Sequence, residues 1–236
     1  MVKSIILKDT YRHRGLRMQL VKQLRKKGIK DERVLNAIMQ IKRHFFLDPA
    51  FADWAYKDVA FPIDAEQTIS QPYTVAIQTE LLMVEKGDKI LEIGTGSGYQ
   101  ACILAHMGAK VYTIERQRLL FDQTNKLLKE IGFTHIRTLF GDGYKGAPRF
   151  APFDKIIITA GATTIPQTLI DQLKPGGIMV IPVGEGDLKT MVRIFKTEDG
   201  KLLKENHGLC RFVPLLPGKT GKKTSEVNVY TYINLD

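Results

Sequence analysis

The sequence predicts a doubly wound, Rossmann-like α/β fold, with a mostly parallel sheet, an antiparallel C-terminal edge and an N-terminal helical extension. Three observations predict it. Short apolar segments alternate with amphipathic helical ones from about residue 73 to residue 183, which is the pattern of parallel strands joined by crossover helices. A glycine-rich turn follows the first of these strands. The unbroken apolar run at 156–158 is typical of a strand that is buried on both faces.

Two amphipathic helices are expected before the alternating part. Leu16, Leu20 and Leu24 recur at helical spacing until Gly28 ends the run, and Asp31 then caps a second helix. Residues 44–72 follow, rich in aromatic side chains and with three prolines. That segment is too apolar for a flexible linker, so we expect it to fold over the domain as a lid or wall.

The alternating part is expected to consist of helices and strands in the following order. After Pro72 we expect a helix at 73–84, a strand at 89–93, a helix at 98–107, a strand at 110–115, a helix at 117–131, strands at 136–141 and 154–159, a helix at 164–173 and a strand at 178–183. Residues 191–196 and 209–215 alternate without a helix between them, so two antiparallel strands are expected to close the sheet. The chain then forms one domain in three parts: residues 1–72 as helices and lid, 73–216 as the ligand-binding core and 217–236 as a tail.

Composition limits the class of protein. The chain has 236 residues, 44% of them hydrophobic, which is enough for one substantial core. Its 35 basic and 25 acidic residues give a net charge of +10, which fits either a nucleic-acid partner or a lysine-rich solvated surface. The second reading is favoured because the basic clusters lack interleaved aromatic residues.

Targeting and redox signals are sparse. The apolar patch Ile5-Ile6-Leu7 is too short for a secretory signal, and no run approaches the roughly 18 apolar residues of a membrane span. Cys102 and Cys210 stand alone and are expected to be reduced thiols. We therefore expect a cytoplasmic protein with no membrane partner.

The glycine-rich turn indicates the ligand. In Glu92-Ile93-Gly94-Thr95-Gly96-Ser97-Gly98 the last glycine comes one residue earlier than in the dinucleotide fingerprint, whose third small residue would fall on Tyr99. Gly94 and Gly96 allow a sharp turn and close approach of a ligand, and the Glu92 carboxylate suits a cation better than a pyrophosphate. This pattern favours S-adenosylmethionine and the class I methyltransferase variant of the fold.

Polar groups at other strand ends extend the site, because ligands of open α/β sheets bind outside the carboxyl ends of the strands. Glu115 lies 21 residues after Gly94, where an acid can accept both hydroxyls of a ribose; alternatively it is a helix-cap neighbour or an ion-pair partner. Asp142, between two glycines, can accept from the adenine amino group beside Gly143, or it forms an ordinary Asp-Gly turn.

The fourth strand end excludes some substrates. Thr159-Ala160-Gly161-Ala162 can neither hydrogen-bond nor stack on an exocyclic base amine as amino methyltransferases do. Neither cysteine follows a proline as carbon-5 pyrimidine methylation requires. The five scattered histidines are expected to be surface or hydrogen-bonded residues rather than metal ligands.

Several further segments resemble the protein-L-isoaspartate O-methyltransferase family. The most restrictive are Gln67-Thr68-Ile69-Ser70-Gln71-Pro72, the glycine motif through Gln100, Gly141-Asp142-Gly143 and Arg211-Phe212-Val213-Pro214-Leu215. The resemblance covers about residues 14 to 216. It implies methyl transfer to the free α-carboxylate of L-isoaspartyl residues in damaged proteins, which starts their repair.

The same resemblance implies roles for the segment before the core. Ser70 would be the active-site serine, with Gln67, Thr68 and Ile69 lining the cofactor. A carboxylate is already ionised at neutral pH, so no general base is needed, and none is assembled in the sequence. Asp64-Ala65-Glu66 departs from the family's glycine-rich pattern at the substrate-facing loop.

We therefore expect a monomer that acts on isoaspartyl proteins and peptides and binds no nucleic acid. The alternatives are an S-adenosylmethionine-dependent RNA methyltransferase, favoured only by the net charge, and a cofactor-binding module without activity.

Overall fold

The N-terminal helices begin at side-chain caps. The structure, a computed structural model, describes residues 8–221. Helix α1 (Tyr11–Lys26) starts after Thr10, whose hydroxyl accepts the His13 N–H at 3.2 Å. Helix α2 (Glu32–Gln40) starts after Asp31, whose carboxylate accepts the Arg33 N–H at 2.8 Å. The Asp31 cap is confirmed, and α1 begins at Tyr11, ahead of the apolar repeat that starts at Leu16, because Thr10 supplies a cap.

The expected lid segment contains two short 3-10 helices, η1 (Arg43–Phe46) and η2 (Pro49–Trp54), and a hairpin of β1 (Phe61–Ile63) and β2 (Gln67–Ile69). No pattern in the sequence predicts this hairpin, since three-residue strands are too short to show alternation. Its turn is unusual because Ala65 and Glu66 both have φ of +56°. The hairpin tip contacts the core: the Asp64 carboxylate accepts from the Gln123 amide at 2.7 Å.

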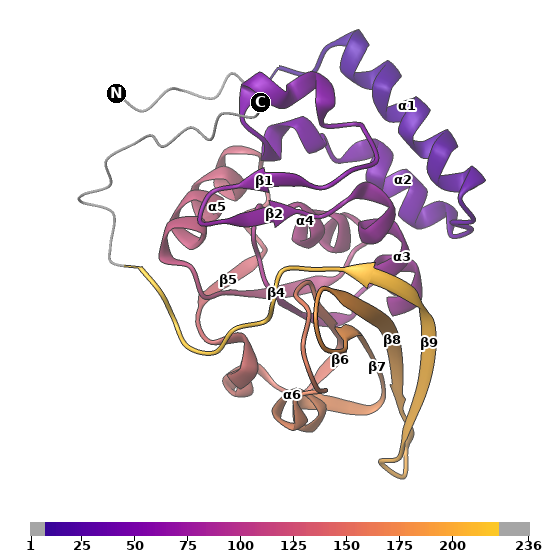
Figure 1. Cartoon of the computed structure of the whole chain (residues 1–236), viewed down its shortest axis with the longest axis vertical. Helices are drawn as coiled ribbons and strands as arrows, with labels where there is room; N and C mark the ends of the chain where they lie inside the picture. The colour runs from indigo at the N-terminus through magenta and orange to yellow at the C-terminus, as the bar shows by residue number, and fades with distance from the viewer. Residues whose placement is uncertain (1–7, 222–236) are drawn as a thin grey trace.

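One seven-stranded sheet forms the core, in the order β5-β4-β3-β6-β7-β8-β9 (Figure 1). Its strands are β3 (Lys89–Ile93), β4 (Lys110–Glu115), β5 (Arg137–Phe140), β6 (Phe153–Ile158), β7 (Leu173–Val183), β8 (Leu188–Lys196) and β9 (Leu202–Arg211). The first five are parallel, and β8 and β9 are antiparallel. The predicted fold class is confirmed, and strand order reverses between β3 and its neighbours β4 and β6.

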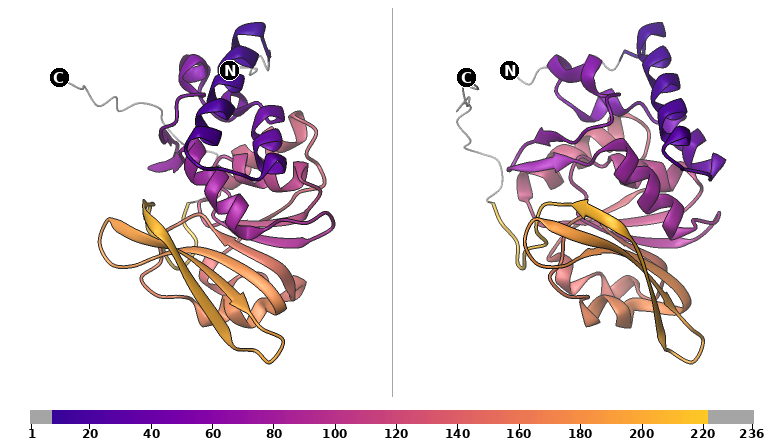
Figure 2. Two further views of the ribbon diagram at one scale, coloured as in Figure 1. Left: turned by 90° about the vertical axis from the view of Figure 1, so that its right-hand side faces the viewer. Right: turned by 45° about the vertical axis from the view of Figure 1, so that its right-hand side comes forward.

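Both faces of the sheet are covered, as expected for a doubly wound fold (Figure 2). Ile90 and Ile157 point into one apolar cluster with the N-terminal helices, while Leu91 and Ile156 point into a second. The remaining helices are α3 (Pro72–Leu82), α4 (Tyr99–His106), α5 (Arg118–Glu130) and α6 (Gln167–Gln172), with short helices η3 (Gly143–Lys145) and η4 (Pro148–Phe150). Helices α3 and α4 contribute to the first cluster and α6 to the second.

Of the predicted strands, β7 and β9 differ most from their expected ranges. Strand β7 begins at Leu173 rather than at residue 178. Strand β9 ends at Arg211 rather than covering 209–215, because its first half is exposed and polar and shows no apolar alternation. The residues after it, which we call the C-terminal strap (212–220), return across the sheet. They form bridges from Pro214 to Gly161 and from Thr220 to Gln117.

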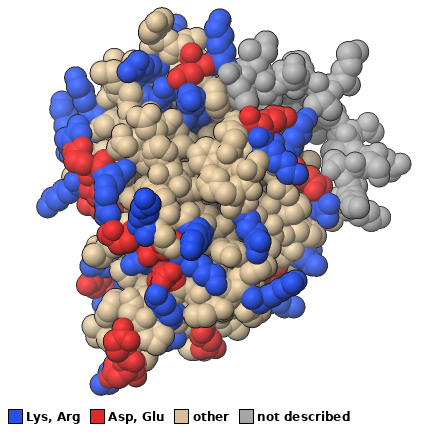
Figure 3. All heavy atoms as spheres, turned by 180° about the vertical axis from the view of Figure 1, so that it is seen from behind, with Lys and Arg blue, Asp and Glu red and all other residues tan. Residues whose placement is uncertain are grey.

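The structure bears on the expectations about membrane segments, cysteines and surface charge. Within residues 8–221, no helix combines the length and apolarity needed to cross a bilayer. Cys102 is a buried free thiol and Cys210 a partly buried one. Lys and Arg are scattered among Asp and Glu on the face seen in Figure 3. The patch at Ile5–Leu7 and the tail from Thr224 lie outside the described residues.

Candidate functional site

The glycine turn closes tightly against a neighbouring strand. At the end of β3, Gly94 has φ of +99°, and a Cβ there would lie 2.6 Å from Oγ1 of Thr159 at the end of β6. Gly96 has φ of +51°. A side chain at Gly94 would therefore be both strained and obstructed. The Thr159 hydroxyl donates to the Gly94 carbonyl at 2.7 Å and so fixes the turn.

A hollow lies beside this turn, at the carboxyl ends of β3, β4 and β6, and is called here the rim pocket. Of the residues singled out from the sequence, its lining includes Gln67, Thr68, Ile69, Ser70, Glu92, Gly94, Gly96, Glu115 and Gly143. The hollow is where the strand order reverses, as open α/β sheets place their ligands. Residues from the lid segment and from the strand ends thus meet around one space.

Glu92 carries an unsatisfied carboxyl group in this pocket. Its side chain is fully buried, and neither carboxyl oxygen has a hydrogen-bond partner in the described part of the chain. Burial, with a smaller contribution from the Glu115 charge and against the opposing effect of the Thr113 hydroxyl, raises the pKa of Glu92 to about 8. A buried acid without a partner is expensive to ionise, so a cationic group entering the pocket would be strongly favoured.

Glu115 is also buried, but its oxygens are engaged. One accepts the Gly96 N–H at 2.9 Å and the other accepts the Gln117 N–H at 2.8 Å. Burial raises the pKa of Glu115, opposed by these backbone hydrogen bonds. The carboxylate therefore braces the glycine turn and also lies at the start of α5. Each oxygen keeps a further lone pair that a hydroxyl in the pocket can use.

Asp142 does not line the rim pocket. Its carboxylate accepts the Tyr144 N–H and, from the C-terminal strap, the Gly218 N–H, both at 2.9 Å. Asp142 thus makes the contacts of an ordinary Asp-Gly turn, which was the alternative interpretation of this residue. It also links the turn to the strap. Only its neighbour Gly143 reaches the pocket.

Ser70 joins β2 to α3 and does not cap that helix. The Tyr73 N–H in the first turn of α3 is accepted instead by the Asp58 carboxylate, at 2.8 Å. Within residues 8–221 no hydrogen bond involves the Ser70 hydroxyl, and the Ser70 carbonyl accepts from the Arg43 guanidinium at 2.8 Å. The hydroxyl is therefore available to a ligand.

A second hollow, the side groove, adjoins the first. It runs between α3 and the edge strands, and it is lined by Ala60, Thr68, Ser70, Gln71, Tyr73, Thr74, Ile77, Thr159, Leu188, Met191 and residues 207–213. Thr68, Ser70, Thr159 and Val213 line both hollows. The Ser70 loop and the end of β6 thus form the junction between the rim pocket and the side groove.

Some lining residues were given no role from the sequence. Tyr99, Thr159 and residues 213–216 of the strap all line the rim pocket. Thr159 ends a strand that was considered small and apolar, yet its hydroxyl holds the glycine turn. The strap residues belong to a quoted motif, but their place beside the pocket depends on a long return of the chain that no local pattern indicates.

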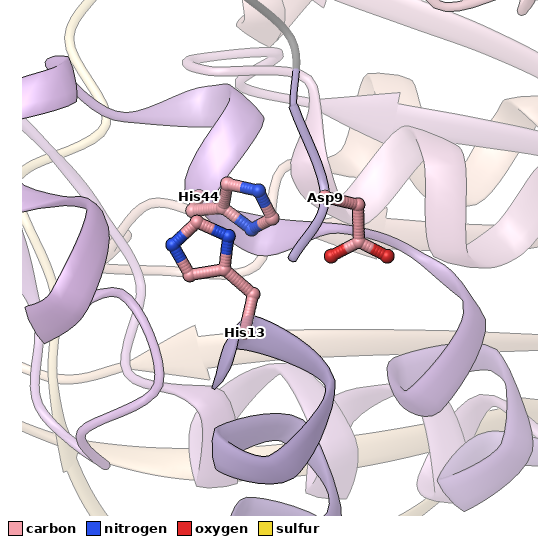
Figure 4. Close-up of side chains that lie close together, drawn as sticks. All are labelled: Asp9, His13 and His44. Atoms are coloured by element: carbon pink, nitrogen blue, oxygen red, sulfur yellow. The ribbon is translucent and has the colours of Figure 1, made fainter. Parts of the chain in front are cut away.

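Two of the five histidines, His13 and His44, form a cluster with Asp9 away from these hollows, whereas His207 lines the side groove. Asp9, His13 and His44 each bring a potential ligand atom within 4.8 Å of the others (Figure 4). Arg17 already donates to both Asp9 oxygens, at 2.8 and 2.9 Å. His44 contacts the Tyr56 hydroxyl at 2.5 Å and the Lys8 carbonyl at 3.3 Å. Hydrogen bonds account for the cluster, which ties the N-terminal helix to the lid segment.

Comparison with known proteins identifies the family. The family model described as protein-L-isoaspartate(D-aspartate) O-methyltransferase matches residues 16–220. A protein-L-isoaspartate O-methyltransferase of Christiangramia forsetii is 56% identical over 213 residues, which are 90% of this chain and all of that protein. One from Flavobacterium psychrophilum is 55% identical over the same share of both chains.

The chain belongs to the protein-L-isoaspartate(D-aspartate) O-methyltransferase family. Solved structures agree. A protein-L-isoaspartate O-methyltransferase with 27% identity has a TM-score of 0.74, covering 88% of this chain and 66% of that one. A Plasmodium falciparum protein described as a putative member, in complex with S-adenosyl-L-homocysteine, shares the fold at 22% identity and a TM-score of 0.73, covering 89% and 99%.

The methyltransferase is therefore an S-adenosylmethionine-dependent enzyme that acts on isoaspartyl residues of proteins and so initiates their repair. Its rim pocket fits that cofactor. The unpartnered, buried carboxyl of Glu92 suits a ligand that carries positive charge at both its sulfonium and its amino group. The glycine turn beside it leaves room for the nucleoside.

Proposed function

We propose that the methyltransferase binds the isoaspartyl residue in the side groove and directs its free α-carboxylate past Ser70 into the rim pocket. The observation that supports this arrangement is that Ser70 lines both hollows. One hydrogen bond from its hydroxyl orients the carboxylate without removing much of its nucleophilicity. Ser70 is then the catalytic residue of the site.

The cofactor is assigned to the rim pocket. When bound there, S-adenosylmethionine supplies an electrophilic methyl group. We propose that Glu92 faces its positive charge, that Glu115 accepts from the ribose hydroxyls and that Gly94 and Gly96 admit its close approach. Gln67, Thr68 and Ile69 would cover it from the lid, and Gly143 with Asp142 would bound the adenine. Because the Asp142 carboxylate already accepts from two backbone N–H groups, we propose that Asp142 shapes the adenine end of the pocket.

The chain supplies position rather than acid–base chemistry. A carboxylate oxygen attacks the methyl carbon as the carbon–sulfur bond breaks, and the electron pair of that bond passes to sulfur. No proton moves, so no general base is required. The protein's tasks are to align the two partners and to exclude water, and the lid hairpin and the strap, which both line the rim pocket, would contribute to this.

The damaged polypeptide fits the side groove by its length and lining. The groove runs from the first turns of α3 to the exposed edge of the sheet at residues 207–213. An extended segment can lie along it while only the isoaspartyl branch enters the junction. This selects for exposed, flexible polypeptide, because a folded surface cannot reach Ser70.

The decisive experiment compares three substrates under identical conditions. The enzyme is incubated with labelled S-adenosylmethionine and an isoaspartyl peptide, the matching aspartyl peptide or bulk RNA. We expect base-labile label on the isoaspartyl peptide and none on the aspartyl control, since a methyl ester hydrolyses readily in base. Stable label on RNA, with none on the peptide, would contradict the proposal.

The RNA alternative has little support. The observation that favoured it was the net charge of +10. On the face in Figure 3, however, acidic side chains lie among the basic ones. In addition, Arg12, Arg25 and Arg33 form ion pairs with acidic side chains. We propose that the enzyme binds no nucleic acid. A cofactor-binding module without activity would bind S-adenosylhomocysteine in calorimetry but label neither substrate.

The remaining expectations stay predictions. We propose a cytoplasmic monomer, to be checked by light scattering, with residues 1–72 as helices and lid, 73–216 as cofactor-binding core and 217–236 as tail. The N-terminal part supplies Ser70 and the core supplies the carboxylates of the rim pocket, so neither part alone is expected to be active.

A further inference from the structure

A buried cation lies behind the Ser70 loop. Arg43, in η1 of the lid segment, is fully buried and is one of the largest side chains so enclosed. The carboxylate whose charge acts on it, Asp58, is ion-paired with Lys27 instead. No carboxylate within residues 8–221 lies at ion-pair distance from Arg43, and its Nη1 has no hydrogen-bond partner there. Burying a charge without a counterion is costly, so this arrangement calls for an explanation.

The guanidinium contacts both parts of the proposed site. Its Nη2 donates to the Ser70 carbonyl at 2.8 Å, and its Nε donates to the Ala55 carbonyl at 2.9 Å. On another side, its Cζ lies 5.0 Å from the ring centroid of Tyr99, which lines the rim pocket. Arg43 therefore connects the loop of the catalytic serine to a wall of the cofactor site.

We infer that Arg43 is a positioning residue, which fixes the Ser70 loop through its carbonyl and whose unpaired charge draws the isoaspartyl carboxylate to the junction. The inference rests on the proposed role of Ser70. The charge is still present at neutral pH, because burial lowers the pKa of Arg43 only to about 10. Because Asp58 is engaged by Lys27 and no carboxylate of the described chain contacts Arg43, an anion that binds at Ser70 adds a counter-charge without touching Arg43.

The placement suits a carboxylate nucleophile. A guanidinium in direct contact would hold the anion in a bidentate pair and suppress its reactivity. The backbone of Ser70 instead separates Arg43 from the substrate. The charge of Arg43 then attracts the carboxylate through a region of low dielectric but leaves both carboxylate oxygens free. Specificity for a charged carboxylate over a neutral side chain then comes from a group outside the groove.

The test uses the full-length enzyme and three variants. Arg43→Met removes the charge and keeps the length, whereas Arg43→Lys keeps the charge and loses the planar fork. Arg17→Met is the matched control: Arg17 is also buried and also contacts the lid segment, through Tyr56, but it is paired with Asp9 and lines neither hollow.

The informative readout is discrimination between charged and neutral ligands. Inhibition constants are measured for a product-like isoaspartyl peptide and for its counterpart in which the α-carboxylate is a carboxamide. In Arg43→Met we expect this preference for the carboxylate to fall at least fivefold and kcat/KM to fall at least tenfold, with S-adenosylhomocysteine affinity within threefold. Arg43→Lys should keep the preference but lose at least fivefold in kcat, and Arg17→Met should lower Tm only.

Two outcomes overturn the inference. One is an Arg43→Met enzyme that binds S-adenosylhomocysteine normally and retains wild-type kcat/KM and preference. The other applies if Arg43→Met does not bind S-adenosylhomocysteine, so that only Arg43→Lys is informative. In that case an Arg43→Lys enzyme with wild-type kcat overturns the inference. Failure of the wild-type enzyme to methylate the isoaspartyl peptide is a different result, which rejects the proposed function itself.

Discussion

Two side chains define the chemistry at the scale of single residues. Ser70 has a hydroxyl free for substrate, and Glu92 has a carboxyl without any partner in the described chain. An unsatisfied carboxyl group as buried as that of Glu92 is ordinarily avoided in a folded interior. Both side chains line the rim pocket, as expected of a site for two charged ligands.

Replacing Ser70 by alanine tests the orienting hydrogen bond. We expect Ser70→Ala to lower kcat/KM for an isoaspartyl peptide by roughly ten- to a hundredfold, because one transition-state hydrogen bond is worth about 1.5–3 kcal/mol when an ion is involved. Calorimetry should show S-adenosylhomocysteine affinity within threefold of wild type. Unchanged turnover would remove Ser70 from the mechanism, and Thr74→Ala, on the same groove, serves as a control.

Glu92 makes cofactor binding depend on pH. Its pKa is raised to about 8 in the free enzyme by burial, so it is protonated at pH 7 and must lose that proton to face a cation. We expect affinity for S-adenosylmethionine to rise with pH up to about 8, by as much as tenfold per pH unit.

Calorimetry in buffers of different ionisation enthalpy measures the proton released on binding. The Glu92→Gln variant should bind S-adenosylmethionine more weakly and lose the part of the slope that belongs to Glu92. An identical slope in wild type and variant would assign the proton to another group, such as the cofactor's own amine.

At the scale of elements, the β1–β2 hairpin combines a functional position with a strained turn. Its tip is fixed to α5 by the Asp64–Gln123 hydrogen bond, and its second strand leads directly into Ser70. The Gln67 N–H donates to the Asp64 carbonyl at 3.2 Å across Ala65 and Glu66. Positive φ at both central residues is typical of a type I′ turn, which favours Asn and Gly.

Relieving this strain should stabilise the protein. We expect Ala65→Gly to raise the free energy of unfolding by up to about 1 kcal/mol, because a left-handed conformation costs a residue with a Cβ about 1–2 kcal/mol, partly offset by the greater unfolded entropy of glycine. Urea denaturation measures it. Ala52→Gly in the right-handed η2 should do the opposite, and a destabilising Ala65→Gly would show that the turn is not strained.

At the scale of the whole molecule, the N-terminal helix is attached through a polar network rather than by apolar packing alone. Arg17 contacts Asp9 and Tyr56, and Tyr56 contacts His44. Burial lowers the pKa of His44 to about 4, so the folded protein holds this ring neutral. Protonation would place a further positive charge near Arg17.

This network makes stability depend on pH. Because the folded pKa of His44 lies below the unfolded value of about 6.5, the unfolded chain binds more protons between about pH 4 and 6.5. The free energy of unfolding should therefore decrease as pH falls through that window, by up to about 1.4 kcal/mol per unit from this group. Tm measured from pH 7 to 5 should fall less steeply in His44→Gln, and equal slopes would contradict the assignment.

The sequence predicted the core better than its surroundings. The strand at 89–93 and its glycine turn matched the structure because buried parallel strands and tight turns leave local signals. The edge strand β9 was misplaced because exposed strands carry no apolar alternation. Thr159, Arg43 and the strap could not be assigned, since their roles arise from contacts between segments more than 25 residues apart.

The strap has a consequence for how the enzyme matures. It supplies residues 213–216 to the pocket and is held there by Gly161, Arg116 and Asp142. A chain interrupted just after β9 would keep the glycine turn and both carboxylates yet leave the nucleoside chamber open on one side. Cofactor retention is thereby coupled to synthesis of the strap, so products truncated directly after β9 should not sequester S-adenosylmethionine.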